Sequence, residues 1–129
     1  MVKTIVKMLV GIAATLALIL SVVLYENKRV TNTFLSFGEV LQTLYEKTEE
    51  GTVTYEDGTA TEAFWENKKN TLHIWLPHSA ILEIDYQLYE AVGCLYVQDY
   101  KSALPKIEIL LGMCKNIPQS YGFRWENIL

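Results

Sequence analysis

Residues 8–24 read MLVGIAATLALILSVVL, and this stretch decides how the chain is organised. Its seventeen residues carry no charge, and the apolar residues 4–6 before Lys7 bring it close to the ~20 residues that cross a bilayer as a helix. A core helix of a small domain would show a polar face, which this stretch lacks. The sequence therefore predicts a transmembrane helix, with residues 1–29 as an N-terminal membrane anchor.

A cleaved signal peptide is the main alternative, because a basic start and an apolar stretch are also its first two regions. Residues 25–29 read YENKR, however, and lack the small-x-small pattern of a cleavage site. An uncleaved signal-anchor usually leaves its N-terminus in the cytoplasm. We therefore expect a single-pass protein of the plasma membrane with an extracytoplasmic helical domain, residues 30–129, although the basic residues on the two sides of the anchor differ little.

Small residues Ala13, Ala17 and Ser21 follow one another at four-residue spacing along the anchor. This spacing allows close approach by another transmembrane helix. Such spacings also arise by chance, so a specific helix partner is the lesser expectation.

The residues beyond the anchor are acidic. Residues 30–129 hold fourteen acidic and seven basic side chains. Gripping a phosphate backbone needs clustered Lys and Arg, so no nucleic-acid partner is expected. An acidic domain is also repelled by anionic lipid headgroups.

Apolar residues recur every three or four positions after Arg29, which indicates amphipathic helices. We expect four of them, over about residues 31–49, 61–76, 78–97 and 99–116. Helices joined by short turns predict an all-α fold, in which the transmembrane helix is followed by an antiparallel up-and-down bundle of about four helices.

Turn and capping signals set the expected helix boundaries. Residues 51–60, GTVTYEDGTA, are expected to form a loop, with Thr61 capping the helix that follows. Pro77 stops that helix, and Asp99 caps the last one. Pro105 would remove a backbone hydrogen bond inside the last helix and bend it, and Pro118 is expected to end this helix.

Catalytic and metal-binding patterns are weak. His73 and His78 flank Pro77, but no third ligand follows at a zinc-helix spacing. The acidic groups at 62 and 66, and at 83, 85 and 90, are typical of a solvated helix face. Without a nucleophile elbow or a phosphate loop, we expect no enzyme, no cofactor and no metal.

The two cysteines, Cys94 and Cys114, could pair in an extracytoplasmic domain. A helical hairpin that turns near residue 98 places them ~16 Å apart along the axis. A disulfide needs Cα atoms within about 7 Å, so separate buried thiols are expected.

Aromatic residues are numerous for so small a bundle, and most should lie in the core. An exposed set around Tyr86 and Tyr89 could form a protein-binding surface, since aromatic side chains are enriched in such surfaces.

Several short segments of residues 64–129 together carry a family resemblance. They are Trp65, LHIWLPH (72–78), ILEID (81–85), DYKSAL (99–104), Ile117-Pro118 and ENIL (126–129). The arrangement resembles domain-of-unknown-function family 4363, uncharacterised membrane-anchored helical proteins found chiefly in Gram-positive, spore-forming bacteria. In this resemblance the recurrent positions, none with a catalytic role, are Trp65, His78, Asp85, Ala103 and Asn127.

The resemblance implies a partner, a multi-span membrane protein of the YetF type. Pro105 and the glycine-containing loop at 51–58 depart from the family pattern. Residues 100–104 also resemble the second helix of a tetratricopeptide unit, with Ala91 and Ala103 twelve positions apart, which makes the C-terminal hairpin weakly tetratricopeptide-like.

We therefore expect a non-enzymatic accessory or scaffold module that docks onto an integral-membrane partner. The alternative is an envelope sensor that binds a small molecule or peptide between its helices. An internal pocket lined by His78 and carboxylates would favour the sensor, and a packed core with an exposed aromatic patch would favour the scaffold.

Overall fold

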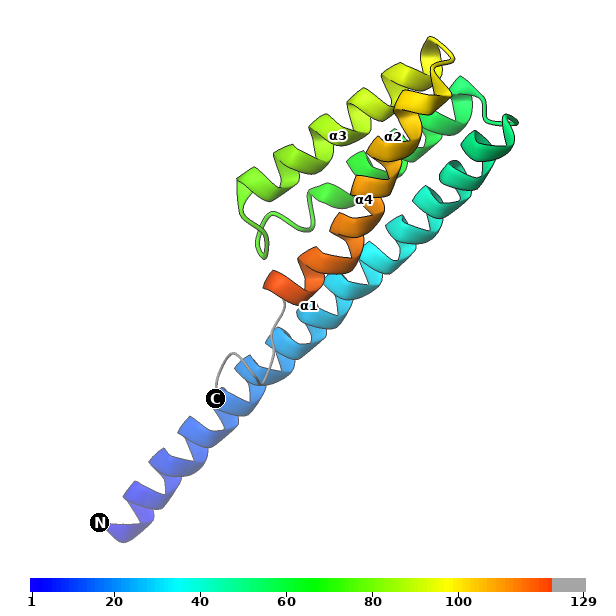
Figure 1. Ribbon diagram of the computed structural model, residues 1–129. Coiled ribbons are helices and arrows are strands. Elements are labelled where there is room, and N and C mark those ends of the chain that lie inside the picture. The colour runs from blue at the N-terminus through cyan, green and yellow to red at the C-terminus, as the bar shows by residue number, and fades with distance from the viewer. Residues whose placement is uncertain (122–129) are drawn as a thin grey trace. The chain divides into compact units, whose positions relative to one another are not determined.

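The computed structural model describes residues 1–121, and every regular element in this range is a helix (Figure 1). The helices are α1 (Val2–Glu50), α2 (Tyr55–Lys69), α3 (His78–Tyr96) and α4 (Tyr100–Tyr121). The prediction of an all-α fold is confirmed. The expected anchor and the first amphipathic helix form one element, α1, because no helix breaker separates them.

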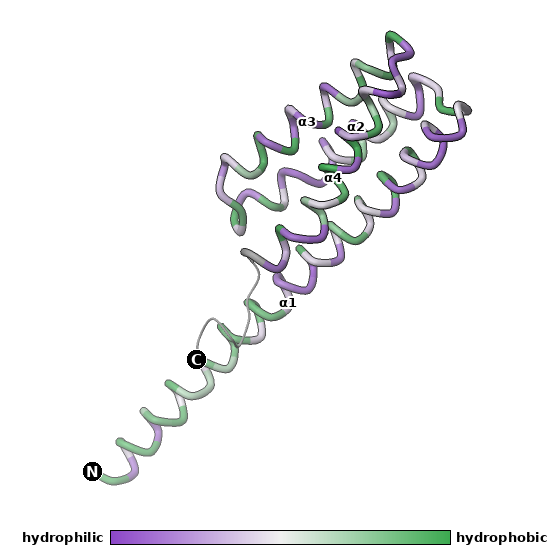
Figure 2. Tube along the Cα trace, viewed as in Figure 1, coloured by the Kyte–Doolittle hydropathy of each residue, from purple (hydrophilic) through white to green (hydrophobic). Residues whose placement is uncertain are grey.

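The chain divides into two units, the first of which holds Met1–Arg29. Figure 2 shows that this part of α1 is mostly hydrophobic. Its most apolar window is long enough to cross a membrane, and none of that window is buried by the protein itself. The hydroxyls of Thr15 and Ser21 donate to the carbonyls of Gly11 and Ala17, at 2.9 and 2.8 Å. These polar side chains are therefore satisfied inside the helix, as an apolar solvent requires.

The second unit begins at Val30 and contains the hydrophobic core, to which all four helices contribute. The α1 residues Phe34 and Phe37 lie against Trp65 of α2, and the Phe37 and Trp65 rings stack with centroids 5.0 Å apart. α3 packs against both α2 and α4. Its buried apolar residues follow the helical period: Ile81, Ile84, Leu88, Ala91, Val92 and Leu95.

Two helix ends adopt the same Schellman geometry. At the end of α1, Gly51 has φ +77° and the Thr52 N–H donates to the Lys47 carbonyl at 2.9 Å. At the end of α3, Gln98 has φ 60° and the Asp99 N–H donates to the Cys94 carbonyl at 2.8 Å. This left-handed conformation suits glycine and strains glutamine. The expected end of the first amphipathic helix near residue 49 and the expected turn near residue 98 are confirmed.

α2 begins six residues before the expected start, so the predicted loop over 51–60 is half wrong. The cap is Thr54, whose side chain accepts from the Asp57 N–H while the Asp57 carboxylate accepts from the Thr54 N–H. Thr61 is instead buried inside α2 and donates to the Asp57 carbonyl. The predicted Thr61 cap is therefore also wrong.

Gly58 lies inside α2, whereas the sequence predicted that it lies in the loop over 51–60. A Cβ at this position would lie 3.2 Å from side-chain atoms of both Val92 and Leu95. The missing side chain therefore lets α2 approach α3 closely. Glycine is also common in turns, so the sequence alone does not distinguish these two uses.

The other boundaries also differ from the prediction at two places. α2 ends at Lys69, and residues 70–76 form turns before the extended cap Pro77. Pro118 does not close α4, which contains both Pro105 and Pro118 and continues to Tyr121. One lost hydrogen bond does not end this helix, since Cys114 and Ile117 are buried and hold its last turns against the core. Asp99 caps α4 as expected, accepting from the Ser102 N–H at 3.2 Å.

Candidate functional site

Trp65 and Asp85, both singled out from the sequence, meet in the interior between α2 and α3. The Trp65 Nε1–H donates to Asp85 Oδ1 at 2.6 Å. Trp65 is fully buried and Asp85 is 7% exposed. A buried carboxylate needs donors to offset its lost hydration, and the indole supplies one of them.

Lys69 supplies the second donor and extends the contact to the surface. Its Nζ lies 3.4 Å from both oxygens of Asp85 and 3.0 Å from Glu66 Oε2. The Tyr89 hydroxyl then donates to Glu66 Oε1 at 2.7 Å. Trp65, Glu66, Lys69, Asp85 and Tyr89 thus form one hydrogen-bonded group, here called the α2–α3 polar cluster.

The charges of this cluster reinforce one another. The hydrogen bond from Tyr89, followed by that from Lys69, lowers the pKa of Glu66. The bond to Glu66 raises the pKa of Lys69, and the same carboxylate raises the pKa of Tyr89 to about 12. At neutral pH the neighbouring groups therefore favour the ionised form of Glu66, the ionised form of Lys69 and the neutral form of Tyr89.

This arrangement suits a structural link between two helices rather than proton transfer. A general acid or base works best with a pKa near the working pH, and these three pKa values are moved away from neutrality. Both Asp85 oxygens already have donors inside the protein. The cluster therefore joins α2 to α3.

The tyrosines of α3 point outward, as the sequence suggested for two of them. Tyr86 is 58% exposed, Tyr89 is 44% exposed, and Tyr96, which the sequence did not single out, is 69% exposed. We call these three residues the tyrosine face. Tyr96 also makes an edge contact with Tyr55 of α2, with ring centroids 5.1 Å apart.

The remaining sequence candidates lie apart from the cluster. Ala103 is fully buried and serves packing. His78 is exposed at the start of α3, with its ring centroid 6.1 Å from that of His73. Among residues 1–121, no group of three or more His, Cys, Asp or Glu side chains could hold a metal ion. Asn127 lies outside the described residues.

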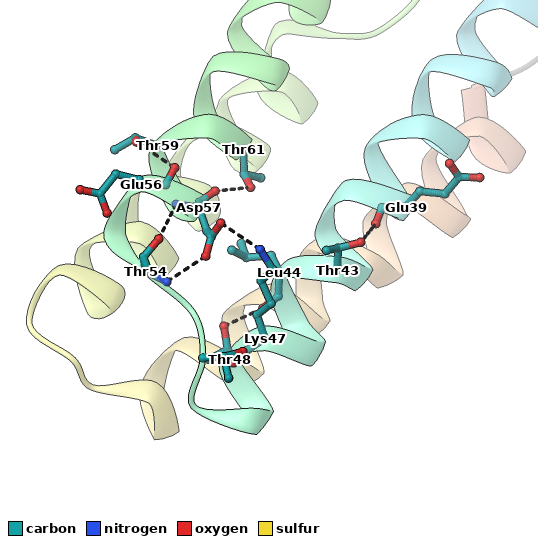
Figure 3. Close-up of polar contacts among 11 residues, drawn as sticks. Glu39, Thr43, Leu44, Lys47, Thr48, Thr54, Glu56, Asp57, Thr59 and Thr61 are labelled. Carbon is teal, nitrogen blue, oxygen red and sulfur yellow. Dashed lines mark hydrogen bonds and ion pairs between the residues drawn. The ribbon is translucent and has the colours of Figure 1, made fainter.

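A shallow groove lies between the later part of α1 and α2. Its volume is about 350 Å³. Figure 3 shows the polar side chains of this region, with Lys47 of α1 directed at Asp57 of α2. Lys47 reaches across from α1, and its Nζ lies 3.1 Å from Asp57 Oδ1. The Thr54 backbone hydrogen bond is the largest cause of the lowered pKa of Asp57. The groove lining is Val40, Thr43, Leu44, Lys47, Asp57, Ala60, Thr61 and Phe64.

Both cysteines are free thiols, as predicted, but the prediction that both are buried holds only for Cys114. Cys94 is half-buried and Cys114 is buried. Burial raises the pKa of Cys114 to about 12, which keeps it protonated and unreactive.

Sequence reasoning missed three of the groups that build these sites. The pattern Thr54-x-x-Asp57 is a capping-box signal that was available in the sequence. Glu66 and Lys69 are spaced for an ion pair within one helix turn. Nothing local indicates that Lys69 also reaches Asp85, sixteen residues away.

Comparison with protein-family models, with curated proteins and with solved structures finds no match to this chain.

Proposed function

We propose that this chain is a membrane-tethered docking module, in which residues 8–24 cross the plasma membrane once and the helical domain holds a partner protein. The N-terminus lies in the cytoplasm and the domain outside. The module is non-enzymatic and acts as an accessory or scaffold for an integral-membrane partner.

The observation that supports this proposal is the tyrosine face of α3. Its three residues are 44 to 69% exposed. Exposed tyrosines are otherwise costly to solubility, whereas they are enriched at the centres of protein interfaces. The interior offers little to a ligand, because the core is packed and the buried Asp85 is satisfied.

Tethering supplies the rest of the mechanism. Two proteins held in one membrane meet at a far higher effective concentration than two free proteins, so a modest interface suffices. The partner implied by the family resemblance, a multi-span membrane protein of the YetF type, is the first candidate to test.

Photocrosslinking in membranes tests the docking role. The photoreactive residue p-benzoylphenylalanine replaces Tyr86, which lies outside the polar cluster, and irradiation is followed by purification under denaturing conditions. Ile109 of α4, which is 49% exposed, provides a matched apolar control position. We expect a discrete, near-stoichiometric adduct with a membrane protein from position 86 and none from position 109. Recovery of the protein alone from position 86 would overturn the proposal.

The groove between α1 and α2 favours a second candidate, an envelope sensor for a small molecule or peptide. Its volume of about 350 Å³ lies at the lower end of ligand pockets. His78 is exposed and does not line this groove, so the histidine–carboxylate pocket expected of a sensor is not the site concerned. Binding of apolar ligands that is lost in the Ala60→Trp protein, whose side chain fills the groove, would favour this candidate.

A further inference from the structure

α3 carries a second regular pattern besides the one that faces the core. Its outward residues lie at intervals of four, three, four and three. They are Leu82, Tyr86, Tyr89, Gly93 and Tyr96, here called the outer seam. Intervals that alternate between three and four are the spacing by which one helix packs along another in a coiled coil. The seam is half-buried at Leu82 and exposed at the other four positions.

Gly93 interrupts the seam with a notch that the fold itself does not need. A Cβ at this position would meet nothing within 4 Å, and its backbone is not in the left-handed region. Glycine inside a helix costs about 1 kcal/mol relative to alanine. A missing side chain on an exposed helix surface allows the backbone of another helix to approach closely.

The two tyrosines that flank the notch are held in place by α2. The Tyr89 hydroxyl is bound to Glu66 at 2.7 Å, and the Tyr96 ring contacts Tyr55. Side chains that are already ordered lose less conformational entropy on binding, so this part of the seam is prepared for contact.

Acidic residues border the seam. Glu83 and Glu90 each follow a seam residue by one position, the place of the flanking charges in a coiled coil. Glu90 is paired with Lys106 of α4 at 2.7 Å, while Glu83 accepts from the neutral amide of Gln87. The charge of Glu90 is thus met by Lys106. A helix flanked by Lys or Arg would complement the charge of Glu83, whereas a second copy of α3, which holds no Lys or Arg, would not.

We propose that the outer seam binds an amphipathic helix of the partner, with small residues opposite Gly93 and a basic residue opposite Glu83. This inference rests on the proposed docking function and names the kind of element that docks. The partner helix lies along α3, with its apolar stripe between Tyr89 and Tyr96.

Two matched glycine variants test it. Gly93→Ala fills the notch, and Gly112→Ala changes a helical glycine of α4 whose Cβ would also meet nothing within 4 Å. Both proteins should unfold at a higher temperature, because alanine favours the helix. Only Gly93→Ala should weaken docking, by about tenfold or more, because an added methyl overpacks a close contact.

Docking is measured with the full-length protein in nanodiscs and two labelled helical peptides of three heptads. The peptides share an apolar seam with Ala at its centre and differ only in Lys or Glu at the flanking positions. We expect the Lys peptide to bind in fluorescence anisotropy, the Glu peptide to bind at least tenfold more weakly, and salt to weaken the former. Equal binding of the two peptides, no binding of either, or unchanged affinity in Gly93→Ala would overturn the inference.

Crosslinking from position 86 separates this inference from the docking role. Loss of the adduct in Gly93→Ala, with retention in Gly112→Ala, supports the helix-binding seam. An adduct that persists in Gly93→Ala overturns the seam and leaves the docking role standing, whereas the lack of any adduct overturns the docking role itself. A dimer in sedimentation that Gly93→Ala dissociates would make a second copy the occupant and also overturn the inference.

Discussion

Replacing Asp85 with leucine tests whether the α2–α3 polar cluster stabilises the bundle. The change keeps the branched shape and the number of heavy atoms of the side chain but leaves the fully buried Trp65 Nε1–H without its acceptor at 2.6 Å. A buried donor without a partner costs about 1–3 kcal/mol, and a hydrogen bond to a charged group contributes about 1.5–3 kcal/mol. Lys69 keeps its contact with Glu66, so its charge stays paired. We expect a loss of about 2–3 kcal/mol.

A double-mutant cycle isolates the contact between the two side chains. Trp65→Phe removes the donor, and the double variant Trp65→Phe/Asp85→Leu removes both partners, so no unpaired group remains. Removing both partners is much less costly than the sum of the two single changes, and a coupling energy of about 1–3 kcal/mol is expected. Asp85→Asn keeps an acceptor oxygen without the charge and should fall between the wild type and Asp85→Leu.

Urea unfolding of the full-length proteins in detergent micelles, followed by circular dichroism at pH 7, measures these free energies. In thermal scans, 1 kcal/mol corresponds to roughly 4–8 °C in Tm for a domain of 60–100 residues. Asp85→Leu should therefore lower Tm by at least about 8 °C. Single-variant losses that add to the double-variant loss within about 0.5 kcal/mol would show that the two side chains are not coupled, and the reasoning would be refuted.

Three further changes are predicted from local geometry. Asp57→Ala removes half of the Thr54 capping box and should cost about 1 kcal/mol. Because the Thr54 backbone hydrogen bond lowers the pKa of Asp57, the ionised Asp57 carboxylate should stabilise the protein above pH about 4, and this stabilisation should disappear as the pH falls further. Urea unfolding at pH 3 and pH 7 measures the loss caused by Asp57→Ala. An equal loss at both pH values would contradict the prediction. Gln98→Gly relieves the backbone at φ 60° and should stabilise the protein by about 0.5–1 kcal/mol in the same assay, whereas an unchanged midpoint would mean that no strain is present. At pH 8 a thiol reagent such as DTNB should label Cys94 but not Cys114, whose pKa burial raises to about 12, and should label both in urea; two rapidly reacting thiols in the native protein would refute the buried position of Cys114.

The sequence by itself determined the helical class, the apolar N-terminal segment and most of the turns. These features depend on residues that are close together in the chain. An unbroken apolar run, an amphipathic period and a glycine after Glu50 each act within one or two turns of helix. The start of α2 is also determined by residues close together in the chain, the capping pattern Thr54-x-x-Asp57, although Gly58 resembled a turn residue.

Only the tertiary structure decided which polar groups meet. Asp85 looked like part of a solvated acidic face, yet it is buried because Trp65 and Lys69 of another helix provide its donors. Such a pairing depends on how far two helices are shifted and rotated against each other. The spacing of apolar residues within one helix does not determine this shift or rotation. The same holds for Gly58 and Gly93. Both lie inside helices of the folded protein, but the packing of α2 on α3 makes Gly58 a contact point, whereas Gly93 of α3 faces away from the other helices and leaves an open notch.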